Sequence, residues 1–291
     1  MKYAWIREHA GVFPVSVMTR VLKVSSSGYY VFRRRMPSKQ ALHRQRITKA
    51  VEESHAVSHG VYGSRKVHQD VIEQEPCCIE TVRKIMREQG LRSVYKRKFT
   101  VTTDSTHTMP IAPNTLGRAF DAEGPNQKWV ADITYIETRE GWLYLAVVMD
   151  LWSRRIVGWA TSQSIDTRLV CAALDSALLS RRPGSKLLHH SDRGSQYASW
   201  DYRQQLALHG VECSMSRRGN CWDNACIERF FRSLKTEWIR GFAFGTAKHA
   251  HSALFEYIEA FYNSTRRHAT LNYLSPVEFE ARALKLTGQM A

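Results

Sequence analysis

The 291-residue sequence has no long hydrophobic run, and this absence excludes one large class of proteins. A membrane-spanning helix needs about 18 or more consecutive apolar residues, and no stretch of the chain comes close. The first residues, MKYAWIREHAGVFPVS, also lack the basic head, apolar block and small-residue cleavage site of a secretory signal. We therefore expect a protein of the cytoplasm that does not contact a membrane.

Cysteine pairs with the spacing of a zinc or redox motif are missing as well. The chain has six cysteines and no CxxC pair. They are Cys77, Cys78, Cys171, Cys213, Cys221 and Cys226. The first two are adjacent and cannot readily bridge each other, and the spacing of the last two matches no common metal signature. We expect reduced thiols with a structural role.

Internal repeats and sustained heptads are also absent, which argues against a solenoid or a coiled coil. The length is too great for one minimal domain and short for three. A large domain with one or two small ones is the expected organisation.

Positive charge, in contrast, is abundant. The chain has 42 lysines and arginines against 27 aspartates and glutamates, a net charge of +15. Residues 1–110 hold 20 of the basic and 9 of the acidic residues, a net charge of +11, and the remainder carries only +4. A surface charge that served solubility alone would be spread more evenly. The uneven excess indicates a polyanionic partner bound by the N-terminal third.

Residues 1–38 have the pattern of a small helix-turn-helix segment. In VFPVSVMTRVLKVSSSGYYVFRRR (12–35) an apolar periodic stretch leads to a serine-rich break, then to an aromatic pair and three arginines. The sequence MPSK (36–39) is expected to be a linker to the next helices.

A second helical DNA-binding module is predicted over residues 39–99, with helices over 41–55, 64–73 and 79–91. In the last helix Val82, Ile85 and Met86 mark the buried side, and basic residues face outward. Such a face suits the groove of a DNA duplex, although a solvated helix face has the same pattern. The candidate DNA-binding residues of this module are Arg65, Lys66, Arg83, Lys84, Arg87, Arg92, Lys96, Arg97 and Lys98.

The composition changes after this module. Residues 100–126 are rich in Thr, Pro, Asn and Gly and are expected to be a linker. Residues 127–240 then form the predicted core, and 241–291 a C-terminal helical extension. In the core, three β-rich runs predict an antiparallel meander, and helices alternating with short strands follow. The fold class is therefore α/β, a mixed five-stranded sheet with helices on both faces. The expected strands are 128–137, 142–152, 155–162, 186–192 and 212–216, and the expected helices are 167–181, 198–210, 246–263 and 276–286, with a further helix that carries Glu228.

Two aspartates occupy unusual places in this pattern. Asp132 lies inside an apolar strand on the same face as Val130 and Ile136, where an ionised carboxylate is costly unless it is paired or bound to a metal. Asp192 ends the fourth strand before the turn at Gly194, so its carboxylate is expected at the edge of the sheet where α/β proteins place their sites.

A glutamate is the third acidic residue in an unusual place. At about 100° per residue, an apolar stripe runs along the predicted helix that carries Glu228, and Glu228 lies on its flank. Arg232 and Lys235 lie on the same flank. The stripe consists of Ile227, Phe230, Phe231, Leu234 and Trp238. One carboxylate from a central strand, one from a strand end and one from a helix flank can therefore converge on one point.

Three carboxylates without clustered Cys or His favour Mg²⁺ or Mn²⁺. Two such ions stabilise the attacking and leaving oxygens of a displacement at phosphorus. With a basic DNA-binding half in the same chain, phosphodiester chemistry on DNA is the natural inference. Any one of these acids alone is more often a helix cap or a surface ion-pair member.

The order and spacing of the three acids resemble a known family. Asp132 lies in WVADITY and Asp192 in HSDRGSQY, and 35 residues separate Asp192 from Glu228 in SMSRRGNCWDNACIERFFRSLKTE. Further matching stretches are YGSRKV and VRKIMREQGL upstream and YNSTRRHATLNYLSPVEFE (262–280) near the end. The chain resembles a DDE transposase of the retroviral-integrase superfamily, the second-frame protein of bacterial insertion-sequence family three, over nearly its whole length.

This resemblance implies an RNase H-like core in which Asp132, Asp192 and Glu228 hold two Mg²⁺ ions. Such proteins cut the ends of a mobile element and join the exposed 3′-hydroxyls to DNA by transesterification. The implied partners are the terminal inverted repeats of the element and the target DNA, bound by a homo-oligomer on the bacterial nucleoid. Lys235 would contact DNA phosphate near the scissile bond, although an ordinary surface lysine has the same spacing.

Other residues near the motifs have supporting or alternative roles. His190 and Gln196 match the family motif and are expected to position Asp192 or DNA, and Asp223 and Asn224 to cap the helix that carries Glu228. Arg217 and Arg218 precede that helix and could bind phosphates or lie in a solvated loop. A serine hydrolase using Ser191 is disfavoured, because neighbouring strand residues point to opposite faces and no nucleophile elbow is present.

Two alternatives remain open at the level of sequence. A nuclease of the RNase H superfamily would share the metals but not the joining, and a domesticated DNA-binding regulator would not need the three acids. The family often fuses this protein to a first-frame partner with a coiled coil. Because the chain has no sustained heptads, it is either the second-frame product alone or relies on its own N-terminal helices to recognise DNA ends.

Overall fold

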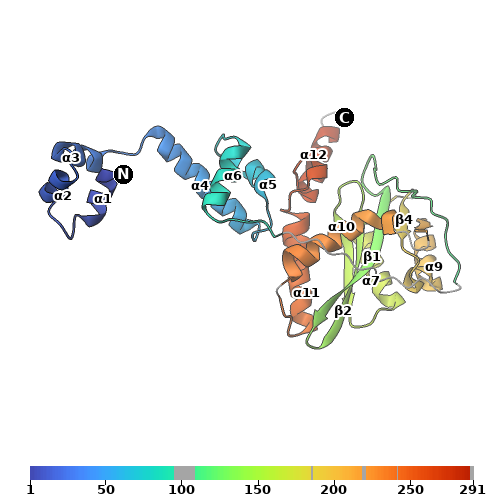
Figure 1. Cartoon of the computed structure of the whole chain (residues 1–291). Helices are drawn as coiled ribbons and strands as arrows, with labels where there is room; N and C mark the ends of the chain where they lie inside the picture. The colour runs from blue at the N-terminus through green and yellow to red at the C-terminus, as the bar shows by residue number, and fades with distance from the viewer. Residues whose placement is uncertain (95–108, 185, 218–220, 241, 289–291) are drawn as a thin grey trace.

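The computed structural model describes residues 1–94, 109–184, 186–217, 221–240 and 242–288. Figure 1 shows an elongated molecule in which a small helical domain at the N-terminus and a second helical module precede a sheet-based domain. The C-terminal helices lie between the second module and the sheet. The candidate DNA contacts Lys96, Arg97, Lys98 and Arg218 lie outside the described residues.

The N-terminal domain is a three-helix unit with a core of its own. Ile6, Met18 and Tyr29, one from each helix, pack together and are buried. Ser25 begins the third helix by accepting a hydrogen bond from the Gly28 N–H at 3.2 Å, which explains the serine-rich break in the sequence. The helices are α1 (Lys2–His9), α2 (Val15–Val21) and α3 (Ser26–Arg34).

The second module also consists of three helices, α4 (Lys39–Val57), α5 (Ser64–Ile72) and α6 (Ile79–Glu88). As predicted, Val82, Ile85 and Met86 are buried. They belong to the same hydrophobic cluster as the C-terminal helices and one face of the sheet. The module is therefore packed on the rest of the protein, whereas the N-terminal domain has a separate core.

The sheet has five strands in the order β3-β2-β1-β4-β5. The pairs β1/β2 and β2/β3 are antiparallel, whereas β1/β4 and β4/β5 are parallel. The predicted antiparallel meander of three strands, followed by two short strands that alternate with helices, is thus confirmed. The strands are β1 (Lys128–Thr138), β2 (Gly141–Asp150), β3 (Ile156–Ser162), β4 (Leu188–Ser191) and β5 (Glu212–Met215).

Helices cover both faces of the sheet. On one face α7 (Thr167–Arg181), α8 (Ser195–Ala198) and α9 (Trp200–Leu208) pack on Trp129 and Ala131 of β1. The approach of α7 to β3 is very close, since a Cβ at Gly158 would lie 2.4 Å from the Ala173 carbonyl oxygen. The helix α10 (Ala225–Leu234) lies on the opposite face, which Val130 and Ile136 share.

The C-terminal segment completes the second face. After the short 3₁₀ turn η1 (Cys221–Asn224), α10 continues directly into the π-helical turn η2 (Lys235–Ile239). Glu280 fixes the last helix to the sheet, because its carboxylate accepts hydrogen bonds from Arg155 at 2.7 Å and from Arg181 at 2.5 Å. The remaining elements are α11 (Ala247–Phe255), η3 (Glu256–Asn263), η4 (Ala269–Leu271) and α12 (Pro276–Gly288).

No helix among the described residues is long and apolar enough to cross a bilayer.

Candidate active site

The candidate site lies where two neighbouring strands separate. Only Lys128, Trp129 and Val130 of β1 pair with β4. Asp132 follows two residues later, and on its other side it still pairs with Val147 of β2. β4 ends at Ser191, one residue after its last pairing with β1, and the carboxyl ends of strands are the usual place for a site in an α/β sheet.

Asp132 is half-buried at this point. Its Oδ1 accepts a hydrogen bond from the Ile133 N–H at 2.8 Å. Burial is the largest cause of a pKa raised well above the usual range, and the negative charges of Asp192 and Glu228 add to it. Asp192 and Glu228 therefore lie close enough to Asp132 to influence its carboxyl group. A cation at this position would relieve both the burial and the repulsion.

Asp192 is held in a tight turn directly after β4. Its Oδ1 accepts the Gly194 N–H at 2.9 Å. A Cβ at position 194 would lie 3.0 Å from this Oδ1 and 2.9 Å from Oε1 of Gln196. Glycine thus permits close approach of the backbone to these two side chains and does not serve a left-handed conformation.

Glu228 lies on the first turn of α10, and the predicted apolar stripe fixes this helix. All five residues of the stripe are buried. Glu228 is itself half-buried; burial raises the pKa of its carboxyl group, and the Arg232 guanidinium opposes this effect. The helix therefore holds Glu228 at the boundary between core and solvent, as the sequence predicts.

The donor set fits a hard divalent cation, since it consists of carboxylates alone. Within the described ranges, however, no three His, Cys, Asp or Glu side chains are gathered closely enough to form a finished metal site. Burial is the largest cause of the raised pKa of Asp132, and the charges of Asp192 and Glu228 contribute to it. The convergence of all three carboxylates on one ion stays a prediction.

Lys235 belongs to the same surroundings. Its Nζ lies 4.5 Å from the centre of the Tyr135 ring, within cation–π range. Burial lowers the pKa of the ammonium group, and the Asp132 carboxylate acts in the opposite direction. A positive charge is thus held next to the carboxylates, on the flank of the helix that also carries Glu228. The Arg232 side chain is exposed on this flank.

The turn before α10 differs from the prediction. Asn224 occupies the residue before the helix, but its side chain does not cap the helix. Instead its Nδ2 donates to the Ala131 carbonyl oxygen at 3.1 Å. Asp223 does not cap the helix either. The predicted capping role is wrong because both side chains have long-range partners that no local pattern reveals.

Asp223 is a buried centre of hydrogen bonds that sequence reasoning missed. It is 0% exposed and accepts hydrogen bonds from Asn114, Arg118 and Arg217 at 2.8–3.0 Å. Hydrogen bonding by Arg217 is the main cause that holds the pKa of this carboxyl well below its usual range. Arg217, a candidate phosphate contact, therefore has an internal partner and joins the loop after β5 to the start of α10.

His190 links the two short parallel strands. It is fully buried, with Nδ1 2.8 Å from Ser214 Oγ and Nε2 3.1 Å from Ser216 Oγ. Burial lowers the pKa of His190 to about 4, so the ring is neutral and structural at pH 7. It supports the β4 and β5 ends directly before Asp192. Gln196 Nε2 donates to the Ile165 carbonyl oxygen at 3.4 Å.

The neighbouring His189 points to the opposite face, where its Nε2 lies 3.0 Å from the Tyr202 hydroxyl. Ser191 Oγ donates to the Asp192 carbonyl oxygen. Neither histidine contacts Ser191 in the described structure, which agrees with the exclusion of a hydrolase.

Most candidate DNA contacts of the second module are exposed, namely Arg65, Arg83, Lys84, Arg87 and Arg92. Lys66 differs from them. It is half-buried with its Nζ 4.9 Å from the centre of the Tyr62 ring, and burial together with the Arg266 charge lowers its pKa to about 7. Its surroundings are internal, so the geometry does not present Lys66 to a duplex.

Family models match three parts of the chain. Two matches are described as an integrase core domain, over residues 122–221 and 228–284, and one as an HTH-like domain over residues 43–99. Asp132 and Asp192 lie inside the first core match, and the second begins at Glu228.

Full-length relatives are insertion-sequence proteins. The chain is 42% identical over 287 residues to transposase InsF for insertion sequence IS3A of Escherichia coli K12, covering 98% of this chain and 100% of the relative. It is 41% identical over 266 residues to an uncharacterised 31 kDa protein of insertion element IS600 from Shigella sonnei, covering 91% and 98%. A simian T-cell lymphotropic virus intasome chain matches with a TM-score of 0.47 at 15% identity, over 79% of this chain and 74% of that one. On the strength of the two full-length relatives and the integrase core matches, the chain belongs to the IS3 family of insertion-sequence transposases and is a DNA strand-cleaving and strand-joining enzyme.

Proposed function

We propose that Asp132, Asp192 and Glu228 are the catalytic carboxylates of this transposase and that they hold two Mg²⁺ or Mn²⁺ ions. The observation that supports this most directly is the position of Asp132, next to the last pairing of β1 with β4: burial raises the pKa of its carboxyl there, and the charges of Asp192 and Glu228 raise it further. When bound, the ions would stabilise the oxygens that attack and leave at phosphorus.

The protein's own residues orient the DNA for two displacements at phosphorus. In the first, a water oxygen attacks a phosphodiester at the end of the element, and a 3′-hydroxyl is released. In the second, this hydroxyl attacks a phosphodiester of the recipient DNA, so that one bond forms as another breaks and no external energy source is needed. Lys235, held against Tyr135 beside Asp132, would bind a non-bridging phosphate oxygen near the scissile bond.

DNA recognition is assigned to the helical modules. The exposed basic residues of α6 and its neighbours would bind the phosphate backbone of the terminal inverted repeats, with the N-terminal three-helix domain as a second contact. The domain division at residues 38, 99, 126 and 240, assembly into a homo-oligomer on DNA at the nucleoid, and the involvement of a first-frame partner belong to the same proposal.

The deciding experiment incubates the full chain with Mg²⁺ and DNA that carries the terminal inverted repeats, and then looks for joined ends. Asp132→Asn, Asp192→Asn and Glu228→Gln should each abolish cleavage and joining while DNA binding is retained. Hydrolysis without joining by the wild type would favour a nuclease, and binding alone a regulator. Substantial joining by any of the three variants would overturn the site assignment.

A further inference from the structure

Two consecutive arginines, Arg266 and Arg267, lie in the YNSTRRHATLNYLSPVEFE stretch, and the catalytic assignment gives them no role. They follow η3, on the segment that separates the second helical module from the face of the sheet that carries α10. Their guanidinium groups contact different parts of the protein.

Arg266 contacts the catalytic helix. Its Nε and Nη2 donate to the two carboxylate oxygens of Glu237 at 2.7 and 2.5 Å, and Nη2 also reaches Ser233 Oγ at 3.3 Å. Both side chains of the ion pair are nearly buried, with 11% and 10% exposed. The Tyr257 hydroxyl donates to the same carboxylate at 2.9 Å. A bidentate pair of this kind fixes position and orientation together, and Glu237 lies two residues after Lys235.

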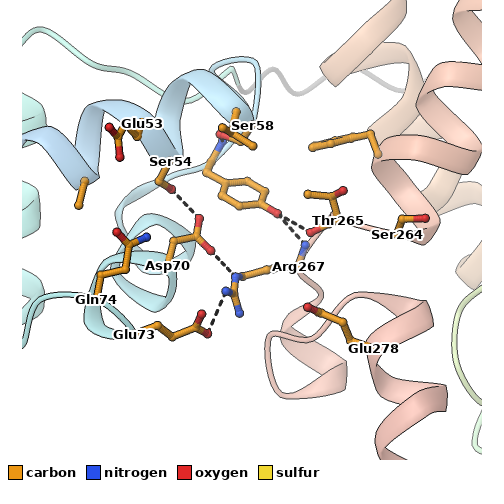
Figure 2. A pocket seen from close by; sticks show the side chains of 14 residues that line it. Glu53, Ser54, Ser58, Asp70, Glu73, Gln74, Ser264, Thr265, Arg267 and Glu278 are labelled. Carbon is orange, nitrogen blue, oxygen red and sulfur yellow. Dashed lines mark hydrogen bonds and ion pairs between the residues drawn. The ribbon is translucent and has the colours of Figure 1, made fainter.

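Arg267 contacts the DNA-binding module. Its Nε donates to Asp70 and its Nη2 to Glu73 at 3.0 Å, both on or directly after α5. Ser54 of α4 holds the Asp70 carboxylate from the other side at 2.5 Å. Figure 2 shows these side chains around Arg267, with Asp70 and Glu73 approaching it from the module.

Tyr62 strengthens the same junction. The tyrosine is 3% exposed, its hydroxyl donates to the Thr265 carbonyl oxygen at 3.2 Å, and it accepts the Arg267 N–H at 2.7 Å. Tyr62 belongs to the YGSRKV stretch, so two motifs about 200 positions apart in the sequence meet here. Nearby His59 stands edge-on to Trp238 of η2 at 4.7 Å between ring centres.

The junction is not filled by apolar packing alone. A cavity of about 350 Å³, lined by residues of α4, α5 and the segment after η3, lies beside these contacts. The second helical module is held partly by polar bonds next to this cavity. We therefore expect the ion pairs of Arg267 to set the orientation of the module, while Tyr62 and His59 keep the module bound to the C-terminal segment.

From these contacts we infer that Arg266 and Arg267 form a two-sided bridge that positions the DNA-binding module relative to the helix carrying Glu228 and Lys235. The bridge fixes the distance between the bound end of the element and the catalytic carboxylates. Both arginines are positioning residues, since they contact other protein groups and not the reacting atoms. This inference rests on the proposed function of Glu228 and Lys235.

The test uses Arg267, because removing Arg266 would leave Glu237 buried without its partner and could prevent folding. Arg267→Asp should leave binding of an inverted-repeat end within about 3-fold, because the exposed basic residues of α6 are unchanged. Joining should fall about 10- to 100-fold, because displacements near 1 Å are costly in catalysis. Cleavage should also spread over neighbouring phosphates.

A charge exchange provides the decisive comparison. Asp70→Arg alone should have the same defect, and the double variant Asp70→Arg/Arg267→Asp should regain most of the joining and the single cut position. Arg203→Glu, which changes the same charge on the exposed side of α9, is the matched control and should join normally.

Normal joining and a single cut position in folded Arg267→Asp would overturn the bridge, as would a double variant no better than either single one. If the wild-type protein itself does not join ends, the proposed function fails instead. The two failures are therefore distinguishable in one experiment.

Discussion

Asn224 donates a hydrogen bond from Nδ2 to the Ala131 carbonyl oxygen at 3.1 Å, and so ties the start of the helix carrying Glu228 to the strand residue next to Asp132. Asn224 is buried, and its Oδ1 has no hydrogen-bond partner in the described structure. A buried amide whose carbonyl oxygen accepts no hydrogen bond lowers the free energy of unfolding. The contact therefore has a positional value, because it ties together the two elements that carry Asp132 and Glu228, two of the proposed catalytic carboxylates.

Asn224→Ala should reduce joining about 10-fold or more, because the start of the helix that carries Glu228 is no longer bonded to the strand that carries Asp132. The lost hydrogen bond should lower the free energy of unfolding by only about 1 kcal/mol. Joining assays and urea unfolding measure the two effects separately.

Asn263→Ala is the matched control for this prediction. Asn263 is also buried and also bonds a strand edge, through the N–H and carbonyl of Ile156, but on β3 away from the carboxylates. It should lose at least as much stability, because it makes more hydrogen bonds than Asn224, while the joining of the folded fraction is unchanged. Equal losses of joining in the two variants would refute a positional role of Asn224.

Gly194→Ala should inactivate the enzyme without unfolding it. The added Cβ would lie 3.0 Å from Asp192 Oδ1 and 2.9 Å from Gln196 Oε1, so the ends of these two side chains must shift. We expect joining to fall about 100-fold, while circular dichroism and the unfolding midpoint change little. Gly245→Ala, where no atom lies within 4 Å of the added Cβ, should behave as the wild type. Full activity of Gly194→Ala would show that the Asp192 turn tolerates displacement.

Local periodicity predicts much of this fold. Alternation along β1 correctly places Val130 and Ile136 on the face opposite Trp129 and Ala131, and therefore shows which face Asp132 shares. The stripe of α10 is buried as its 3.6-residue spacing requires. Strand alternation and helical spacing are properties of neighbouring residues, so one sequence is enough to read them.

Contacts between distant residues could not be predicted in this way. The partners of Asp223 include Asn114 and Arg118, more than 100 positions earlier, and Arg267 bonds Asp70 from nearly 200 positions away. Nothing in the local pattern around Asn224 distinguishes a helix cap from a hydrogen bond to another strand. The capping prediction was wrong for this reason.

Acid should destabilise the protein through its buried histidines. Burial lowers the pKa of His189 to about 3, so the folded state keeps this ring neutral while the unfolded chain binds a proton below about pH 6.5. The unfolded state thus binds more protons between pH 6.5 and 3, and stability falls as the pH decreases through this window. His189 alone contributes up to about 1.4 kcal/mol per pH unit.

The pH dependence can be assigned by comparing His189→Gln with the wild type. Urea unfolding between pH 7.5 and 5 should show a smaller loss of stability in the variant, although its stability at pH 7.5 is reduced because the Tyr202 contact is altered. A parallel pH dependence of the two proteins would mean that His189 is protonated in the folded state or plays no part.

Asp223→Asn should both destabilise the fold and slow the joining of DNA ends. The change keeps the size of the side chain but removes the charge that Arg118 and Arg217 share, at a position that is 0% exposed. Because hydrogen bonds to a buried charge are worth about 1.5–3 kcal/mol, the free energy of unfolding should fall by about 2 kcal/mol at pH 7.

The folded-state pKa of Asp223 is lowered, so its contribution is present above about pH 4 and is lost as the pH falls further. The difference between variant and wild type should therefore shrink in acid. Asp166→Asn is the control, since Asp166 pairs with exposed Arg168 and asparagine can also begin α7. Its stability should stay close to that of the wild type. Arg217→Ala separates the two roles of that arginine: a loss of stability like that of Asp223→Asn identifies an internal partner, whereas weaker DNA binding at unchanged stability would identify a phosphate contact.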